Sequence, residues 1–404
     1  MSYVSLKKYF YKDPNKGEEE YLKRFNSDEA IRLDIELNGK PAFFVMSNDI
    51  YRSVLRLMKA DKNIATLTKD LPVKALHQFT IENLISEIVI TNEIEGVNST
   101  RKEIGNALEY LEQDDKRIRF KGLVKKYLML NDSHDKPITS AKEIREIYDE
   151  LVLEEVLENN PEAKPDGKLF RKDSVSVYDS AGREVHTGTQ GEARIVDALE
   201  KLLLFLNRID VNPLVRVAVF HFAFGYIHPF YDGNGRINRY VSSRYVSIYY
   251  EPLIGYGLSF IIKQRLKEYY QAFKEVEHPL NRGDLTPFVI SFCDMVAESA
   301  EMISASLNEK KNQFDHCDRA IQIKLNSKGV TDQHLCDLSS VLLQATLFAE
   351  SGISTKELVS FFGVSRQTIN NWVKKVSEVL KIEKTKEGKD VFYQVDLTGL
   401  EGVS

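Results

Sequence analysis

The chain has 404 residues, more than one hydrophobic core usually organises, so its length predicts two or three domains. A hydrophobic share of 43% and a charged share of 28% exclude collagen-like, wholly disordered and disulfide-scaffold proteins, and a net charge of −5 excludes a polycation built for nucleic acid. The chain has three cysteines, shows no signal-peptide pattern at its start and contains no apolar run near the ~18 residues of a membrane span. These features predict a cytoplasmic protein without a membrane partner.

The first predicted region, residues 1–60, is an N-terminal segment with a small β-hairpin. Apolar residues alternate with polar ones from Ile31 to Leu37, and a second apolar run follows Asn38 and Gly39. Alternation with a period of two around Asn-Gly is the strongest local sign of a hairpin.

A long helical region follows, and TNEIEG at residues 91–96 holds a carboxylate in an unusual place. Gly96 is typical of a helix C-cap, and Thr100 with Glu103 has the spacing of a capping box that opens the next helix. Glu95 therefore falls in the last turn of a helix of about residues 80–96, where a carboxylate opposes the helix dipole. Either it is a solvated surface residue that costs little, or a cation pairs with it.

Further along, residues 138–158 predict another helix, with Ser140 as its N-cap. Prolines and a glycine then interrupt the chain, and an alternating stretch around Asp-Ser-Ala-Gly predicts a small hairpin within residues 170–188. Residues 213–227 are apolar nearly all round and begin with Pro213, which predicts a helix buried in the middle of a bundle.

That helix is followed by HPFYDGNGRINR (228–239), which combines a glycine pair with two arginines. Gly233 and Gly235 permit the backbone to turn successive N–H groups into one concavity, and a helical pattern resumes directly after them. Unpaired N–H groups and the dipole at a helix N-terminus favour phosphate. Arg236 and Arg239 are three residues apart, so they share a helix face and suit further phosphates.

Two more side chains of this segment suit catalysis. Asp232 offers the hard carboxylate oxygen that Mg²⁺ binds together with substrate phosphates, and His228 is a proton acceptor beside it. Phe230, between them, suits a core anchor. Each residue alone is more often structural than catalytic, but a turn does not explain all of them within one short segment.

This segment resembles the signature of the Fic family, His-x-Phe-x-(Asp/Glu)-Gly-Asn-Gly-Arg-x-x-Arg, at every specified position. A looser resemblance covers roughly residues 60–300. It implies a mainly α Fic domain over residues 61–300 and a protein adenylyltransferase that transfers AMP from ATP to a Ser, Thr or Tyr hydroxyl of a protein. Phosphorylating relatives carry Lys where Gly235 stands, so this glycine favours adenylylation.

The resemblance also implies roles for single residues. His228 deprotonates the target hydroxyl, which attacks the α-phosphate and expels pyrophosphate. Asp232 holds Mg²⁺, Asn234 and the glycine amides bind the α- and β-phosphates, and Arg239 binds the γ-phosphate. The nucleotide-binding residues implied in this segment are Asp232, Gly233, Asn234, Gly235, Arg236 and Arg239.

The upstream segment resembles a second Fic motif, (Ser/Thr)-x-x-x-Glu-(Gly/Asn), which is autoinhibitory. Thr91, Glu95 and Gly96 stand at its specified positions, and the first two share a helix face. The resemblance implies that Glu95 pairs with Arg239 and blocks productive placement of the γ-phosphate. It groups the chain with Fic proteins whose inhibitory helix precedes the core.

Two further features are expected from the family. The hairpin at 170–188 resembles the Fic flap, whose edge holds a target segment by β-augmentation; Val185, His186 and Thr187 follow where many flaps continue into prolines. The segment LKEYYQAF resembles the region near the adenine and nominates Tyr269 and Tyr270, although paired tyrosines at a helix end are as often core residues.

The C-terminal part is expected to hold a charged helical connector, residues 301–340, and a winged helix-turn-helix, residues 341–404. Ser354 and Glu357 form a capping box, and Gly363 and Ser365 suit the turn before a second helix. Residues 353–396 hold eight Lys or Arg against six Asp or Glu, a weak charge for a DNA binder, so DNA and protein contacts both stay open. The side chains suited to a DNA groove are Arg366, Gln367, Asn370 and Lys374.

The leading interpretation is therefore an autoinhibited protein adenylyltransferase that uses ATP and Mg²⁺ on a protein partner. One alternative is removal of AMP from a modified protein, in which Glu95 would position the attacking water. Another is a DNA-binding regulator whose Fic core senses nucleotide. The His and Cys spacing near residues 316–336 does not fit a structural zinc site, so no zinc is predicted. Self-modification and a homodimer are left open.

Overall fold

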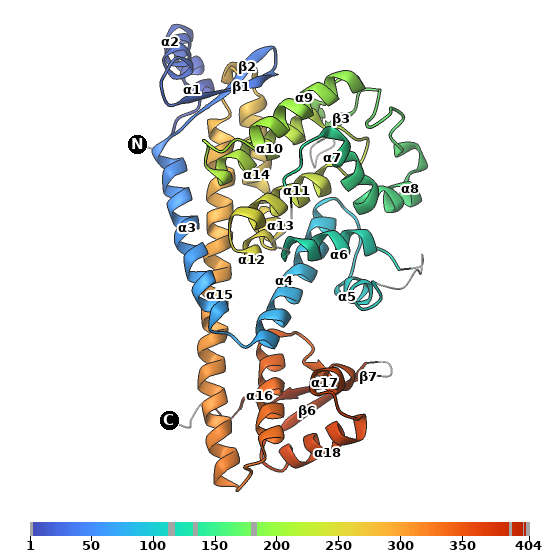
Figure 1. Cartoon of the computed structure of the whole chain (residues 1–404). Helices are drawn as coiled ribbons and strands as arrows, with labels where there is room; N and C mark the ends of the chain where they lie inside the picture. The colour runs from blue at the N-terminus through green and yellow to red at the C-terminus, as the bar shows by residue number, and fades with distance from the viewer. Residues whose placement is uncertain are drawn as a thin grey trace. The chain divides into compact units, whose positions relative to one another are not determined.

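A computed structural model describes the chain over residues 3–111, 118–131, 136–178, 184–387, 390–398 and 400. Helices dominate, and the strands are few and short, as Figure 1 shows. The mainly α fold class expected from the sequence is confirmed.

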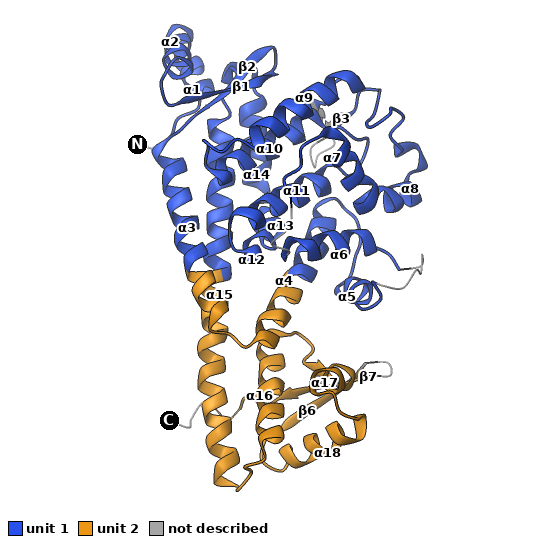
Figure 2. Cartoon of the chain, in the orientation of Figure 1, with its two compact units in different colours: residues 1–62, 84–303 blue, residues 63–83, 304–404 orange. Residues whose placement is uncertain are grey.

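The chain divides into two compact units, which Figure 2 colours separately. Unit 1 holds residues 1–62 and 84–303, and unit 2 holds residues 63–83 and 304–404. The changes from one unit to the other fall inside three long helices: α3 (Asn48–Lys69), α4 (Val73–Ile94) and α15 (Thr286–Ser327). The domain boundaries expected at residues 60, 300 and 340 stay predictions.

Unit 1 opens with two helices and the predicted hairpin. Their bounds are α1 (Leu6–Lys12), α2 (Pro14–Phe25), β1 (Ala30–Leu37) and β2 (Lys40–Val45). Asn38 and Gly39 connect the antiparallel strands with φ of 51° and 70°, the left-handed pair that a tight two-residue turn requires. A small core of Leu6, Phe10, Ala30 and Phe43 holds the helices and the hairpin together.

The segment between α4 and the middle of the chain consists of short helices. They are α5 (Arg101–Glu109), α6 (Lys121–Leu128), η1 (Met129–Asn131), α7 (Ala141–Tyr148), η2 (Asp149–Leu153), α8 (Glu154–Asn159) and η3 (Pro161–Ala163). Thr100 and Glu103 make both hydrogen bonds of the predicted capping box, and Ser140 caps α7 as expected. The element η2 is a π-helical turn, a form that is frequent near functional sites.

The rest of unit 1 surrounds one buried helix. The elements are β3 (Ser176–Tyr178), β4 (Glu184–Thr187), α9 (Glu192–Leu206), α10 (Pro213–Ile227), α11 (Asn234–Tyr249), α12 (Pro252–Gly255), α13 (Leu258–Gln264), α14 (Leu266–Glu277) and η4 (Pro279–Asn281). The side chains of α10 are buried on almost every side, and the helix packs against α9 and α11 (Figure 1). The predicted central helix is confirmed, with Pro213 in its first turn and Asn212 as its N-cap.

Unit 2 ends in a small α/β module. Its elements are α16 (Gln333–Phe348), β5 (Ile353–Ser354), α17 (Thr355–Phe362), α18 (Arg366–Val376), β6 (Ile382–Glu387) and β7 (Asp390–Val395). The strands form an antiparallel sheet in the order β5-β7-β6, and the caps expected at Ser354 and Ser365 are present. Two helices before a β-wing are what a winged helix requires, but that identity and a DNA contact stay predictions.

In the described part of the chain, no helix combines the length and apolar character needed to cross a membrane.

Candidate active site

The candidate site lies where α10 ends and α11 begins. His228 is the C-cap of α10 and has a left-handed backbone, with φ 52° and ψ 64°. Gly233, also left-handed with φ 79°, is the N-cap of α11. The intervening loop thus brings the unpaired N–H groups at the start of a 16-residue helix next to the histidine.

The imidazole of His228 is held in the form that a general base needs. Its Nδ1 lies 3.2 Å from the carbonyl oxygen of Gly225. A carbonyl only accepts hydrogen bonds, so this contact assigns the proton to Nδ1 and leaves the ring lone pair on Nε2.

Phe230 and Asn234 hold the loop in shape. Phe230 is fully buried and its ring stacks on Tyr148, with centroids 3.8 Å apart, so it is the core anchor predicted from the sequence. The Asn234 side chain accepts from the N–H of Phe230 at 2.9 Å and donates to its carbonyl at 2.8 Å. The expected phosphate contact of Asn234 stays a prediction, because its amide oxygen already serves the loop.

Asp232 is exposed at the same loop, and its carboxylate accepts from the N–H of Gly233 at 2.5 Å. Among the described residues, no group of three or more His, Cys, Asp or Glu side chains could hold a metal ion by themselves. One exposed carboxylate beside a helix N-terminus nevertheless fits Mg²⁺, which binds through one or two carboxylates together with substrate phosphates.

Arg236 is 1% exposed and pairs with Glu155 of α8 through Nη1. Its buried Nε has no hydrogen-bond partner within the described ranges. Glu155 is the second residue of α8, directly after the π-helical turn η2 and Glu154, and this partner was not predicted from the sequence. The guanidinium lies on the first turn of α11, as a phosphate-binding arginine should.

Arg239 is 2% exposed and contacts the predicted inhibitory segment. Its Nε donates to Thr91 Oγ1 at 2.7 Å, and its Nη2 donates to the Thr91 carbonyl at 3.0 Å. The same Nη2 lies 2.8 Å from Glu95 Oε1. Burial disfavours the charge of Arg239, but the Glu95 carboxylate together with Tyr269 and Tyr127 raises the pKa of Arg239 above its ordinary value.

Glu95 also lies directly against the glycine nest. A Cβ added to Gly235 would stand 2.7 Å from the carboxyl carbon of Glu95, so no side chain fits there while Glu95 keeps this position. Gly96 has φ 72°, and the N–H of Val97 donates to the Asn92 carbonyl at 2.9 Å, which completes the glycine C-cap expected for α4. The cap ends the helix so that the carboxylate reaches the N-terminus of α11.

A second carboxylate fixes the same face of α4. Glu87 is fully buried and accepts from the N–H and hydroxyl of Ser259, at 2.9 and 2.5 Å. Burial raises the pKa of Glu87 to about 7, against the lowering effect of these hydrogen bonds. Glu87, Thr91 and Glu95 recur every four residues along one helix face, a spacing that could have revealed Glu87 in the sequence.

The two tyrosines nominated for the adenine site differ. Tyr269 is 7% exposed, and its hydroxyl lies 2.7 Å from Nε2 of the buried His221. Burial raises the pKa of Tyr269 and lowers the pKa of His221, so both are neutral in the core. Tyr270 is 45% exposed and suits a contact with a bound base better, although the role of both residues stays a prediction.

The hairpin predicted at residues 170–188 is present as β3 paired antiparallel with β4, and its role as a flap stays a prediction. Its turn, residues 179–183, lies outside the described residues, as do the side chains of Val185 and His186. Thr187 is exposed and pairs with Ser176 across the hairpin. The target contact expected of these three residues stays a prediction.

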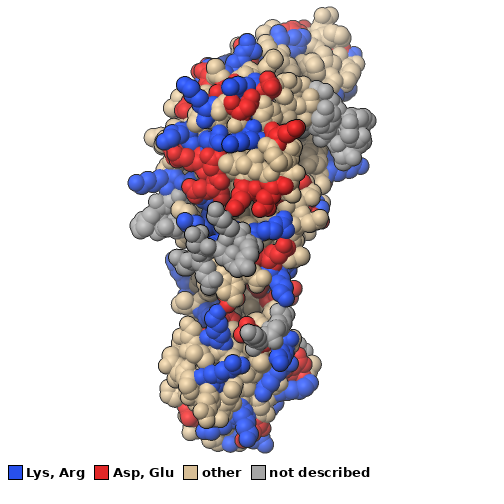
Figure 3. All heavy atoms as spheres, turned by 90° about the vertical axis from the view of Figure 1, so that its right-hand side faces the viewer, with Lys and Arg blue, Asp and Glu red and all other residues tan. Residues whose placement is uncertain are grey.

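Acidic side chains gather on the face shown in Figure 3. On α8, Glu154 and Glu158 are exposed. This surface does not attract a triphosphate. The positive charges nearest to the start of α11 belong instead to its two buried arginines, Arg236 and Arg239.

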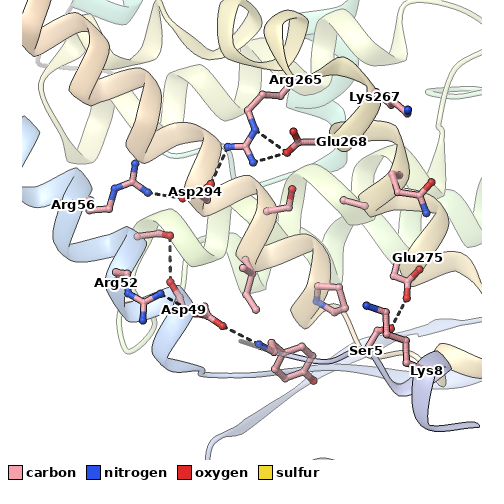
Figure 4. Close-up of a pocket in the computed structure, with 17 residues that line it drawn as sticks. Ser5, Lys8, Asp49, Arg52, Arg56, Arg265, Lys267, Glu268, Glu275 and Asp294 are labelled. Atoms are coloured by element: carbon pink, nitrogen blue, oxygen red, sulfur yellow. Dashed lines mark hydrogen bonds and ion pairs between the residues drawn. The ribbon is translucent and has the colours of Figure 1, made fainter. Parts of the chain in front are cut away.

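A hollow of about 970 Å³ in unit 1 contains none of the predicted site residues (Figure 4). Charged side chains that line the hollow form ion pairs with one another. Asp294 accepts from Arg56 at 2.5 Å and from Arg265 at 2.8 Å, and Arg265 also pairs with Glu268 at 2.6 Å. We assign it no part in the chemistry.

Comparison with known proteins agrees with this site. Residues 138–246, which include the whole 228–239 segment, match the Fic/DOC family model. The chain is 28% identical over 149 residues to the protein adenylyltransferase Fic of Drosophila ananassae, and 28% identical over 137 residues to that of Drosophila melanogaster. These matches cover 37% and 34% of the chain but only 27% and 25% of the relatives, so the chain matches about a quarter of their length. A Fic family protein from Desulfovibrio desulfuricans G20 shares the fold, with a TM-score of 0.55 and 20% identity over 87% of this chain and 97% of that one.

Proposed function

We propose that this chain, whose residues 138–246 match the Fic/DOC family model, is a protein adenylyltransferase that moves AMP from ATP to a hydroxyl group of a protein. One observation carries the proposal: a histidine base, a helix N-terminus and two buried arginines converge within residues 228–239. The activity named for the curated relatives supports the same reaction.

In this reaction, Nε2 of His228 takes the proton of the target hydroxyl while the hydroxyl oxygen attacks the α-phosphorus of ATP. A new phosphorus–oxygen bond forms, and the bond from the α-phosphorus to the oxygen bridging to the β-phosphate breaks. Pyrophosphate leaves with that electron pair. The products are an AMP-modified protein and pyrophosphate, and the proton on His228 is then released to solvent.

The triphosphate would be seated by the N-terminus of α11. The N–H groups in the first turn of α11 would bind phosphate oxygens, and Arg236 and Arg239 add two positive charges on the same helix. Asp232 would hold Mg²⁺, which when bound neutralises phosphate charge and orients the leaving group. Asn234 would contribute mainly by holding the loop.

We further propose that the resting enzyme is autoinhibited by Glu95. Its carboxylate takes the guanidinium group of Arg239 that a γ-phosphate needs, and it stands against Gly235, where a phosphate would lie. A negative charge there would also repel the triphosphate, and beside the buried Arg239 this repulsion is screened less than in bulk water. ATP would then bind unproductively until Glu95 moves away.

The test is labelling of proteins with ATP that carries its label either on the α-phosphate or on the γ-phosphate. Adenylylation transfers only the α-label, phosphorylation transfers only the γ-label, and a pure nucleotide sensor transfers neither. Wild type and Glu95→Gly should both be measured, with His228→Ala as the catalytically dead control. Label from the γ-position, or no protein labelling by either active form, would contradict the proposed reaction.

Target identity, self-modification, a homodimer and a DNA or protein contact through residues 341–404 stay predictions. The four side chains expected to face DNA are exposed on α18: Arg366, Gln367, Asn370 and Lys374. Exposure alone does not choose between DNA and protein, so no second function is proposed.

A further inference from the structure

Arg171 is a buried arginine without an ion-pair partner in the described part of the chain. It is 0% exposed, and its guanidinium donates to three backbone carbonyls, those of His228 at 2.8 Å, Ile227 at 3.2 Å and Asp173 at 2.5 Å. Burial lowers the pKa of Arg171, but an arginine keeps its charge at neutral pH. A full positive charge is therefore buried beside the proposed base, where it donates hydrogen bonds to backbone carbonyls.

The backbone that Arg171 binds is strained. His228 is a non-glycine residue in the left-handed region, and such a conformation persists only where its surroundings fix it. Besides the guanidinium, the N–H of Thr189 donates to the Ile227 carbonyl at 3.0 Å, and the N–H of Arg171 donates to the Pro229 carbonyl at 3.3 Å. The residues just before β3 and just after β4 thus hold both sides of the histidine.

The contact between the base of the flap and His228 is tight. A Cβ on Gly188 would stand 2.6 Å from Nη2 of Arg171 and 2.9 Å from the Cβ of His228. Gly188 lies one residue after the end of β4, so the flap strand ends directly against the histidine. A displacement of Arg171 or of this strand end would therefore move the backbone of His228.

We infer that Arg171 is the positioning residue of His228: its guanidinium fixes the left-handed turn at which the imidazole meets Gly225, and it ties the flap to the base. The inference rests on the proposed function, in which His228 takes the proton of the target hydroxyl. Because Arg171 acts on the geometry of the base, it should govern the chemical step and leave ATP binding nearly unchanged.

The test uses the full chain in the Glu95→Gly background, with AMP transfer measured per folded molecule. Arg171→Ala should lower kcat by ~10- to 100-fold, since a misplacement of about 1 Å can cost ~10²-fold, and should leave KM for ATP within about threefold. Guanidinium ion at millimolar concentration should restore part of the lost kcat by filling the vacated site. If Arg171→Ala does not fold, Arg171→Lys keeps the charge but cannot reach three carbonyls, and should show the same loss.

Arg216→Ala is the matched control. Arg216 is also buried, 2% exposed, and donates to a backbone carbonyl, that of Leu206 at 2.8 Å, but it lies at the other end of α10. Its loss should lower stability without changing kcat per folded molecule, and guanidinium should have no effect. Equal kcat in the Arg171 variant and its parent, or an Arg171 effect confined to KM, would overturn the inference.

A second readout does not need activity. In protein labelled with ¹⁵N-histidine, the ring nitrogens of His228, identified by their loss in His228→Ala, should report one tautomer in the parent and a mixture in the Arg171 variant. Unchanged nitrogen shifts would overturn the positioning role. If the parent transfers no AMP but these shifts still change, the proposed function fails while the role of Arg171 stands.

Discussion

Arg236 and Arg239 lie three residues apart on α11, both are almost completely buried, and each pairs with a glutamate, yet the two pairs are built differently. The Glu155 side chain is 13% exposed and belongs to α8, inside the segment that matches the family model. The Glu95 side chain is 26% exposed and belongs to the turn after α4, outside that segment.

The difference lies in what each arginine keeps when its glutamate leaves. Arg239 retains two hydrogen bonds to Thr91, and the phosphate seat at Gly235 opens. The Nε of Arg236 already has no hydrogen-bond partner within the described residues, and without Glu155 its Nη1 would lose its carboxylate partner as well. The Glu95 pair is therefore suited to being exchanged for a phosphate, and the Glu155 pair is suited to holding its arginine in place.

The largest effect on the rate of AMP transfer should come from His228, which belongs to neither ion pair. His228→Ala leaves both arginines and the helix N-terminus intact, so ATP should still bind, but AMP transfer should fall by ~10²–10⁴-fold because the general base is lost. Transfer rates and nucleotide affinity measured on the same preparation check this. Undiminished transfer would remove His228 from the mechanism.

The Glu155 pair should matter mainly for stability. Glu155→Ala leaves a buried guanidinium uncompensated, and the free energy of unfolding should drop by about 3 kcal/mol. Urea unfolding measures the drop, and Glu158→Ala, an exposed glutamate on the same helix, is the control that should change little. Faster AMP transfer with unchanged stability would instead make Glu155 a second brake and erase the contrast between the two pairs.

Glu87 allows a pH test of how the C-terminal half of α4 is held within unit 1. Because burial raises the pKa of Glu87 from 4.5 to about 7, the folded protein keeps a proton between these pH values that the unfolded chain has released. The contribution of Glu87 to the free energy of unfolding should therefore be present at pH 4.5 and fall by up to about 3 kcal/mol as the pH rises to 7.

Glu87→Gln carries no titrating group, so subtracting its unfolding free energies from those of the wild type across pH 4.5–8 isolates this term. A difference that does not vary with pH would contradict the assignment, and Glu93→Gln, an exposed neighbour on α4, is the matched control.

Local signals in the sequence predicted much of this architecture. Asn38-Gly39 gave a hairpin because two left-handed residues suit only such a turn, and Thr100 with Glu103 marked a helix start through hydrogen bonds that span three residues. The all-apolar composition of residues 213–227 required burial, so α10 was predictable as the central helix. Each of these depends on neighbours in the chain.

The partners of the site were mostly not predictable, because they join distant segments. Glu155 meets Arg236 across 81 residues, Arg171 meets His228 across 57, and Glu87 meets Ser259 across 172. The spacing of Glu87 with Thr91 and Glu95 marks a shared helix face, but no local pattern names the distant residue that a buried glutamate or arginine will contact. The expected contact of Glu95 with Arg239 came from the resemblance between motifs, and the structure has it at 2.8 Å.

The central claim, that Glu95 occupies the seat of the γ-phosphate, is tested most directly by the rate of AMP transfer at saturating ATP. Glu95→Gly removes the ion pair between Glu95 and Arg239, which is partly exposed and contributes about 1.4 kcal/mol to the inhibited state. Without this contribution, AMP transfer should be about tenfold faster than in the wild type. Glu93→Gly places a glycine two residues before position 95, but Glu93 pairs with Lys263 at 2.9 Å and not with Arg239, so this control should keep the wild-type rate. Equal rates for Glu95→Gly and the wild type, or an equal gain in Glu93→Gly, would contradict the claim.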